Sequence, residues 1–166
     1  MENKKFILAV YVENKAGVLT RVTAMFTRRG FNIDTITAGE TEDKGYTRIT
    51  LCLRGDEYVR EQVISQLKKL YVVKKVELIE DDPIQRELML IKVRNSSEHR
   101  NDIMAAVDVF RASVIDYSAE GMCIEVTGNP SKIDAFVKLM KPFDILEMCR
   151  TGIVALDRGE TTLLSK

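Results

Sequence analysis

The strongest constraint on the fold is an order of strand-like and helix-like segments that occurs twice along the chain. In the first half, apolar alternation predicts strands at 6–12, 32–40, 46–53 and 72–79, with amphipathic helices after the first and third strands. Arg28, Arg29 and Gly30 predict the end of the first helix, and Asp56 predicts the start of the second. This half therefore has the order β-α-β-β-α-β.

The second half has the same order. Strands are expected at 87–94, 113–117, 122–127 and 143–148, with Asn129-Pro130 starting the second helix of this half. The predicted class is α+β, with two ferredoxin-like βαββαβ domains. The acidic segment Glu80–Pro83 is typical of a linker. We expect an N-terminal domain over 1–80, a linker over 81–84 and a C-terminal ferredoxin-like domain over 85–166.

The composition argues against several functional classes. The 166 residues carry 25 Lys and Arg and 25 Asp and Glu, so no net field attracts nucleic acid or a membrane surface. The apolar run Phe6–Val12 is too short to span a bilayer, and it lacks the small-residue cleavage site of a signal peptide. Cys52, Cys123 and Cys149 are scattered without CxxC spacing, which predicts buried thiols in a reducing cytoplasm.

The sequence offers no catalytic or metal-binding constellation. His99 is the only histidine and lies in a polar segment before a predicted helix, where a solvated or capping role is expected. No cluster has the spacing of a transition-metal site, and no glycine-rich phosphate motif occurs. We therefore expect no catalytic residue, no metal ligand and no cofactor in this chain, although a catalytic site assembled only by the fold stays open.

The same fold also binds RNA, so its strand motifs are relevant. Lys44–Leu51 begins like the RNP1 motif, but the positions that need aromatic rings hold Arg48 and Leu51. No basic patch compensates for these missing rings. RNA binding is thus a minor alternative.

The turn Glu13–Leu19 has the chemistry of a small-ligand site. The N–H groups around Gly17, Val18 and Leu19 begin a helix, where a carboxylate is favoured. Asn14 can both donate and accept hydrogen bonds, and Ala16 leaves space for a short aliphatic side chain. Such a turn suits a small zwitterion. The alternative is an ordinary capped turn with Asn14 as the local cap.

The second strand offers a complementary surface. In this fold it lies at the edge of the sheet, and Asn32–Ile36 has little edge protection beyond Asp34. Pairing with the same strand of another copy would join two sheets. Asn32, Ile33 and Asp34 would then approach the first turn of the other subunit, with Asp34 near a ligand ammonium.

At these residues the chain resembles a known family, the ACT-domain small regulatory subunit of acetolactate synthase (acetohydroxyacid synthase). The resemblance covers nearly the whole chain. Its motifs are Val12–Val22, Phe26, Arg29–Ile33, Gly55-Asp56, Arg86–Val93, Phe110–Ala112, Asp116 and Arg150–Leu156.

The resemblance implies a non-catalytic regulatory subunit. Its partner would be a larger catalytic subunit that holds thiamine diphosphate, Mg²⁺ and FAD and acts in branched-chain amino-acid synthesis. The small subunit would raise that activity and confer feedback inhibition by valine, bound at a homodimer interface between ACT domains. By position, Asn14, Gly17, Val18 and Leu19 would form the turn side of the site, and Asn32–Asp34 the strand side. A free-standing ACT sensor of another target remains the alternative.

Overall fold

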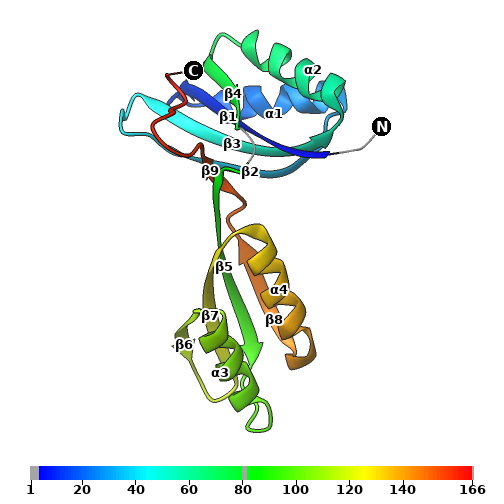
Figure 1. The fold of residues 1–166 in the computed structure, drawn as a ribbon, viewed down its shortest axis with the longest axis vertical. Coiled ribbons are helices and arrows are strands. Elements are labelled where there is room, and N and C mark those ends of the chain that lie inside the picture. Colours follow the sequence, from blue (N-terminus) through cyan, green and yellow to red (C-terminus); the bar gives the residue numbers. More distant parts are fainter. Residues whose placement is uncertain (1–3, 80–81, 166) are drawn as a thin grey trace. The chain divides into compact units, whose positions relative to one another are not determined.

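The computed structural model describes residues 4–79 and 82–165, which form two compact units (Figure 1). Unit 1 contains residues 1–84 together with 153–166, and unit 2 contains residues 85–152. Each unit has a β-α-β-β-α-β core, so the predicted α+β class with two ferredoxin-like folds is confirmed.

Unit 1 is a four-stranded antiparallel sheet with α1 and α2 on one face (Figure 1). The strand order is β2-β3-β1-β4, so β2 and β4 lie at the two edges. The prediction that the second strand is an edge strand is therefore correct. The elements are β1 (Lys4–Glu13), α1 (Val18–Arg29), β2 (Ile33–Glu40), β3 (Tyr46–Gly55), α2 (Glu57–Lys68), β4 (Val73–Leu78) and the C-terminal β9 (Val154–Leu156).

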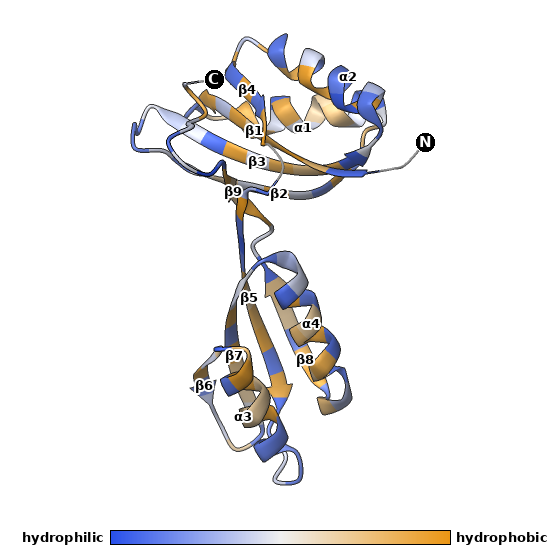
Figure 2. Ribbon diagram, viewed as in Figure 1, coloured by the Kyte–Doolittle hydropathy of each residue, from blue (hydrophilic) through white to orange (hydrophobic). Residues whose placement is uncertain are grey.

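Unit 2 repeats this arrangement with strand order β6-β7-β5-β8. Buried and more exposed residues alternate along β5, and Figure 2 shows the matching alternation of hydrophobic and hydrophilic residues. The elements are β5 (Ile84–Arg94), α3 (Arg100–Val109), β6 (Ser113–Tyr117), β7 (Gly121–Gly128), α4 (Pro130–Met140), the 3₁₀ turn η1 (Lys141–Phe143) and β8 (Ile145–Arg150).

Short-range chemistry sets the ends of three helices where the sequence predicts them. Gly30 ends α1 with φ 68°, a left-handed conformation that glycine adopts without a Cβ penalty. The Asp56 side chain accepts a hydrogen bond from the N–H of Val59, and Asn129 accepts one from the N–H of Lys132.

Each unit has its own core between sheet and helices. In unit 1, Phe26 of α1 and Leu67 of α2 pack on the inward residues of β1 and β3. In unit 2, Phe136 is fully buried and meets Phe110 edge to face, with ring centroids 5.2 Å apart. The two cores share no residue.

The second face of the unit 1 sheet is covered by the C-terminal segment. Figure 1 shows the C-terminal segment running along the face of this sheet that lies opposite α1 and α2. Ile153, Ala155 and Leu163 are buried there in a cluster with residues of β1 and β3. Arg158 also donates from Nε to the backbone oxygen of Asp82 at 2.9 Å. The expected second domain over 85–166 is therefore wrong at its C-terminal end, because 153–166 buries its apolar residues on unit 1.

Other boundaries also differ from the sequence-based prediction. β5 begins at Ile84, so this residue of the expected 81–84 linker is strand, while residues 80 and 81 lie outside the described part of the chain. The strand predicted at 143–148 runs instead from Ile145 to Arg150, because Lys141–Phe143 forms a 3₁₀ turn. Of the three cysteines predicted to be buried, Cys52 is buried, Cys123 is half-buried and Cys149 is exposed.

No helix within the described residues has both the length and the apolar character needed to cross a bilayer.

Candidate ligand-binding site

The turn between β1 and α1 is built on a left-handed glycine. Gly17 occupies the N-cap position with φ 80° and ψ −2°, and no side chain caps the helix there. Asn14 instead bonds to the β2–β3 connection: its Nδ2 donates to the backbone oxygen of Lys44 at 3.1 Å and to Oε1 of Glu40 at 3.4 Å. The alternative in which Asn14 is the local helix cap is thus wrong.

The first turn of α1 presents free backbone donors. The N–H of Val18 bonds to the oxygen of Lys15 at 3.3 Å, and that of Arg21 bonds to the oxygen of Gly17 at 3.1 Å. Within the described residues, the N–H groups of Leu19 and Thr20 have no hydrogen-bond partner. No acidic side chain lies in this turn, so the positive end of the helix dipole is not neutralised there.

Side chains from the turn are divided between the core and the surface. Val18 is buried in the unit 1 core, so its side chain is not available to a ligand. Ala16 and Gly17 are exposed, and Leu19 leaves 46% of its surface accessible. The turn side of the predicted site thus offers Leu19 as its larger apolar side chain, with Asn14 at its polar end.

Two lysines form ion pairs with the carboxylate of Glu13 at the start of the turn. Glu13 forms ion pairs with Lys74 at 2.6 Å and with Lys15 at 2.9 Å. Hydrogen bonds from Lys74 and Lys15 lower the pKa of Glu13 to about 2. Glu13 therefore stays ionised and paired at neutral pH, and the two lysines balance its charge beside the helix N-terminus.

The strand side of the predicted site has a different local environment. Ile33 is half-buried and packs on the core, whereas Asn32 and Asp34 are exposed. Asp34 lies at an irregularity in the β2–β3 register, and its Oδ2 accepts from Nε of Arg54 at 2.7 Å. A ligand ammonium at Asp34 would therefore share this carboxylate with Arg54.

Within one chain the two halves of the predicted site lie at opposite ends of the sheet. Glu40, which contacts Asn14, pairs with Thr47 of β3, and Ile33 pairs with Leu53. The six residue steps between these β3 positions correspond to about 20 Å at the usual strand rise. A small ligand cannot touch both halves of the same chain.

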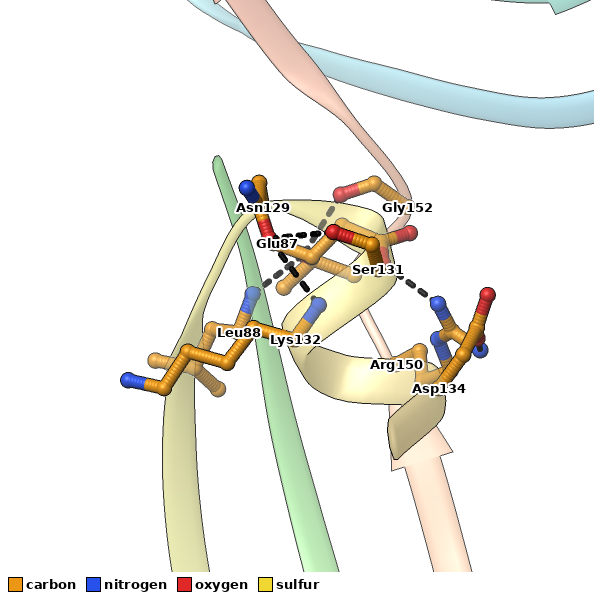
Figure 3. A network of polar contacts seen from close by, with 9 residues as sticks. Glu87, Leu88, Asn129, Ser131, Lys132, Asp134, Arg150 and Gly152 are labelled. Atoms are coloured by element: carbon orange, nitrogen blue, oxygen red, sulfur yellow. Dashed lines mark hydrogen bonds and ion pairs between the residues drawn. The ribbon is translucent and has the colours of Figure 1, made fainter. Parts of the chain in front are cut away.

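Unit 2 contains a polar cluster that the sequence analysis did not predict. Glu87 on β5 is buried, and its carboxylate accepts a hydrogen bond from Arg150 of β8, which also reaches Asp134 of α4 at 2.8 Å (Figure 3). Burial opposes the charge of Arg150, but its bonds to Glu87 and Asp134 outweigh this and raise its pKa. The cluster links β5 and β8 to α4, and each of its three charged side chains has an ion-pair partner, so we assign it a structural role.

The remaining candidates for chemistry are isolated. The ring of His99 lies 5.5 Å from that of Phe143, and His99 occupies the N-cap of α3 without a side-chain cap bond. In the part of the chain that the structure describes, no group of three or more His, Cys, Asp or Glu residues is placed to hold a metal ion.

Family models match both halves of the chain. Residues 8–75 match the acetohydroxyacid synthase small subunit-like ACT domain, and residues 86–159 match the small subunit of acetolactate synthase. The second match extends past residue 152 into the segment that packs on unit 1.

Full-length relatives and a solved structure agree with these models. The chain is 46% identical to a probable acetolactate synthase small subunit of Archaeoglobus fulgidus, over 93% of this chain and 98% of that protein. It is 44% identical to the acetolactate synthase small subunit of Mycolicibacterium smegmatis, over 92% and 90% of the two chains. The crystal structure of the small subunit from Thermotoga maritima is 40% identical and superposes with a TM-score of 0.90, covering 95% of this chain and 99% of that one.

Proposed function

The chain belongs to the family of acetolactate synthase small subunits, and from this premise we propose that it regulates a separate catalytic subunit. In this proposal it raises the activity of that subunit and mediates feedback inhibition by valine or another branched-chain amino acid. The observation that carries the proposal is the family match over both units of the chain. The thiamine diphosphate, Mg²⁺ and FAD of the reaction would be held by the catalytic subunit.

The effector site would lie between two copies of this chain. β2 is an edge strand, so its outer side can pair with the same strand of a second copy. Antiparallel pairing centred on β2 would bring Ile33 of one copy opposite Glu40 of the other. Glu40 contacts Asn14 within each chain. Ile33 of one copy would therefore lie close to the β1–α1 turn of the other, at about the distance between two paired strands.

Each side would recognise a different end of the amino acid. The free N–H groups of Leu19 and Thr20 and the helix dipole suit the effector carboxylate. Asp34 would bind the ammonium in competition with Arg54, and Leu19 and Ala16 would contact a short aliphatic side chain. Binding across two chains favours one quaternary state, which would alter the catalytic subunit through differential affinity.

The decisive assay reconstitutes the chain with its catalytic subunit, with and without valine. We expect Asn14→Ala to abolish valine inhibition while activation persists, because the Lys44 and Glu40 contacts that orient the turn are lost. Asn101→Ala, an exposed helical asparagine in unit 2, is the matched control. Full valine sensitivity of Asn14→Ala would contradict the site assignment.

A second experiment tests the partner. If no catalytic subunit copurifies with this chain, the result would favour a free-standing sensor.

Mixing two variants tests whether the site is shared. In the proposed dimer, each site combines Asn14 of one chain with Asp34 of the other. A homodimer of either variant, Asn14→Ala or Asp34→Ala, therefore has one altered residue in each of its two sites. A mixed dimer has one site with both defects and one with neither, so partial valine sensitivity should return when the two inactive variants are combined. Each variant alone at the same total concentration is the control. If the mixture stays insensitive, Asn14 and Asp34 do not meet across a dimer.

A further inference from the structure

Unit 2 has an exposed surface where α3 lies beside the edge strand β6 (Figure 1). Its large side chains are Arg100 and Met104 of α3 and Ile115 and Tyr117 of β6. Met104 follows Arg100 by four residues, so both lie on the same face of the helix. Ile115 and Tyr117 leave 53% and 54% of their surfaces accessible, and Met104 is also exposed. We call these four residues the α3–β6 surface.

The guanidinium of Arg100 is held in place by buried structure. Its Nε donates to Oδ1 of Asn95 at 3.0 Å, and its central carbon lies 5.9 Å from the centre of the Tyr117 ring. Asn95 is itself buried and fixed, because its Nδ2 donates to the backbone oxygen of Ser118 at 2.6 Å and its N–H to that of Glu120 at 2.9 Å. Arg100 is therefore oriented before any partner binds.

The outer donors of Arg100 are free. Its Nη groups have no hydrogen-bond or ion-pair partner among the described residues. The arginines at 94 and 150 in the same unit differ, because each forms an ion pair with a carboxylate of this chain. A fixed guanidinium with free Nη donors suits two parallel hydrogen bonds to a carboxylate. Charge complementarity therefore requires an acidic side chain on the partner.

The other side chains of the α3–β6 surface indicate a protein partner. Tyr, Met and Arg are enriched in protein–protein interfaces, and Tyr and Arg are frequent among the residues that contribute most to binding. Tyr117, Met104 and Arg100 supply all three types, and Ile115 adds apolar area. A small anion on Arg100 would leave the apolar side chains in water. A protein surface with a carboxylate beside apolar residues covers both.

Strand pairing with a second copy is disfavoured at β6. The register with β7 shifts between Val114 and Asp116, so Ile115 lies at a bulge with two paired residues on either side. Short strands and bulges both limit the addition of another strand to a sheet edge. β6 has five residues, whereas β2, which we propose to pair between copies, has eight. The α3–β6 surface thus offers side chains rather than a backbone edge.

We propose that the α3–β6 surface docks the catalytic subunit. Arg100 binds a carboxylate of that subunit, and Met104, Ile115 and Tyr117 pack on apolar residues around it. This inference rests on the proposed function, in which the chain acts on a separate catalytic subunit. It assigns docking to unit 2, while the proposed effector site lies in unit 1.

The test measures the affinity of the full chain for the catalytic subunit by calorimetry without valine. We expect Tyr117→Ala and Ile115→Asp each to weaken binding at least about tenfold. Arg100→Glu should weaken it further, because it places like charges together. Ile115 has no side-chain hydrogen bond to lose, so Ile115→Asp tests docking even if Arg100→Glu disturbs the bond to Asn95.

Unit 1 supplies a matched control pair. Arg21 lies over the exposed ring of Tyr71, with 5.1 Å between the guanidinium carbon and the ring centre, but no side-chain hydrogen bond among the described residues positions Arg21. Arg21→Glu and Tyr71→Ala should bind the catalytic subunit as the unaltered chain does. Amide hydrogen exchange in β6 should slow when the catalytic subunit is added.

The outcomes separate this inference from the proposed function. If the unaltered chain neither binds nor activates the catalytic subunit, the proposed function fails and this inference fails with it. If the unaltered chain binds, but the three α3–β6 variants bind equally well or β6 gains no protection, only the docking assignment is overturned. A change in the oligomeric state of the isolated chain in Ile115→Asp would show that a second copy covers this surface, which also overturns the assignment.

Discussion

Gly17 is the residue whose backbone conformation determines the geometry of the β1–α1 turn. Its φ of 80° lies in the left-handed region, which a Cβ disfavours, although no atom lies within 4 Å of the position a Cβ would take. Within one chain, a methyl group at this position is therefore disfavoured by backbone strain and not by a steric clash.

Gly17→Ala should accordingly destabilise unit 1 by about 1–2 kcal/mol. Gly39→Ala is the control: the space around it is equally open, and its φ is not left-handed, so its stability should change by less than about 0.5 kcal/mol. Denaturant unfolding monitored by hydrogen exchange of unit 1 measures both. Equal stability of the two variants would show that the turn accommodates an alanine without strain.

At the scale of elements, the short C-terminal segment has the largest effect on the architecture. β9 and the residues around it cover the sheet face that the helices leave open. Ile153 is fully buried there, next to the glycine at which the chain leaves unit 2. The C-terminal segment, whose sequence has no clear apolar periodicity, is thus part of the unit 1 core.

Ile153→Ala should destabilise unit 1 by about 2–4 kcal/mol, because it leaves a cavity between the segment and the sheet. Hydrogen exchange should rise in β1 and β3 and stay unchanged in β5 and β7. Val154→Ala, at the exposed first residue of β9, is the control and should have little effect. Loss of protection in unit 2 rather than unit 1 would contradict the assignment of 153–166.

On the scale of the whole molecule, the chain is two folding units in which the second is inserted into the first. The main chain passes between them at residues 84–85 and again at 152–153. Their cores on the helix sides of the sheets share no side chain. Unit 2, with 68 residues between Gln85 and Gly152, has a small core of its own.

Phe136→Ala should therefore destabilise unit 2 selectively, by about 3–5 kcal/mol. Hydrogen exchange should accelerate across β5, β7 and α4, while α1 and β1 keep their protection. Phe26→Ala should give the reverse pattern, which makes the two variants controls for each other. Simultaneous loss of protection in both units in either variant would show that they unfold as one.

Much of this protein is determined by its sequence over short distances. The strand and helix order follows from apolar periodicity, and the ends of α1, α2 and α4 follow from Gly30, Asp56 and Asn129, whose interactions reach only a few residues along the chain. The edge position of β2 follows from the βαββαβ order itself.

Only the tertiary structure decided which distant residues meet. The position of Asn14 in the sequence is typical of a helix cap. In the fold its side chain instead donates hydrogen bonds to residues 40 and 44, and no side chain caps α1. The terminal segment carries too few apolar residues for a clear periodic signal, yet it finds the open sheet face that residues far away in sequence create. Residues 42, 48 and 157 lie around one cavity for the same reason, because only long-range packing brings them together.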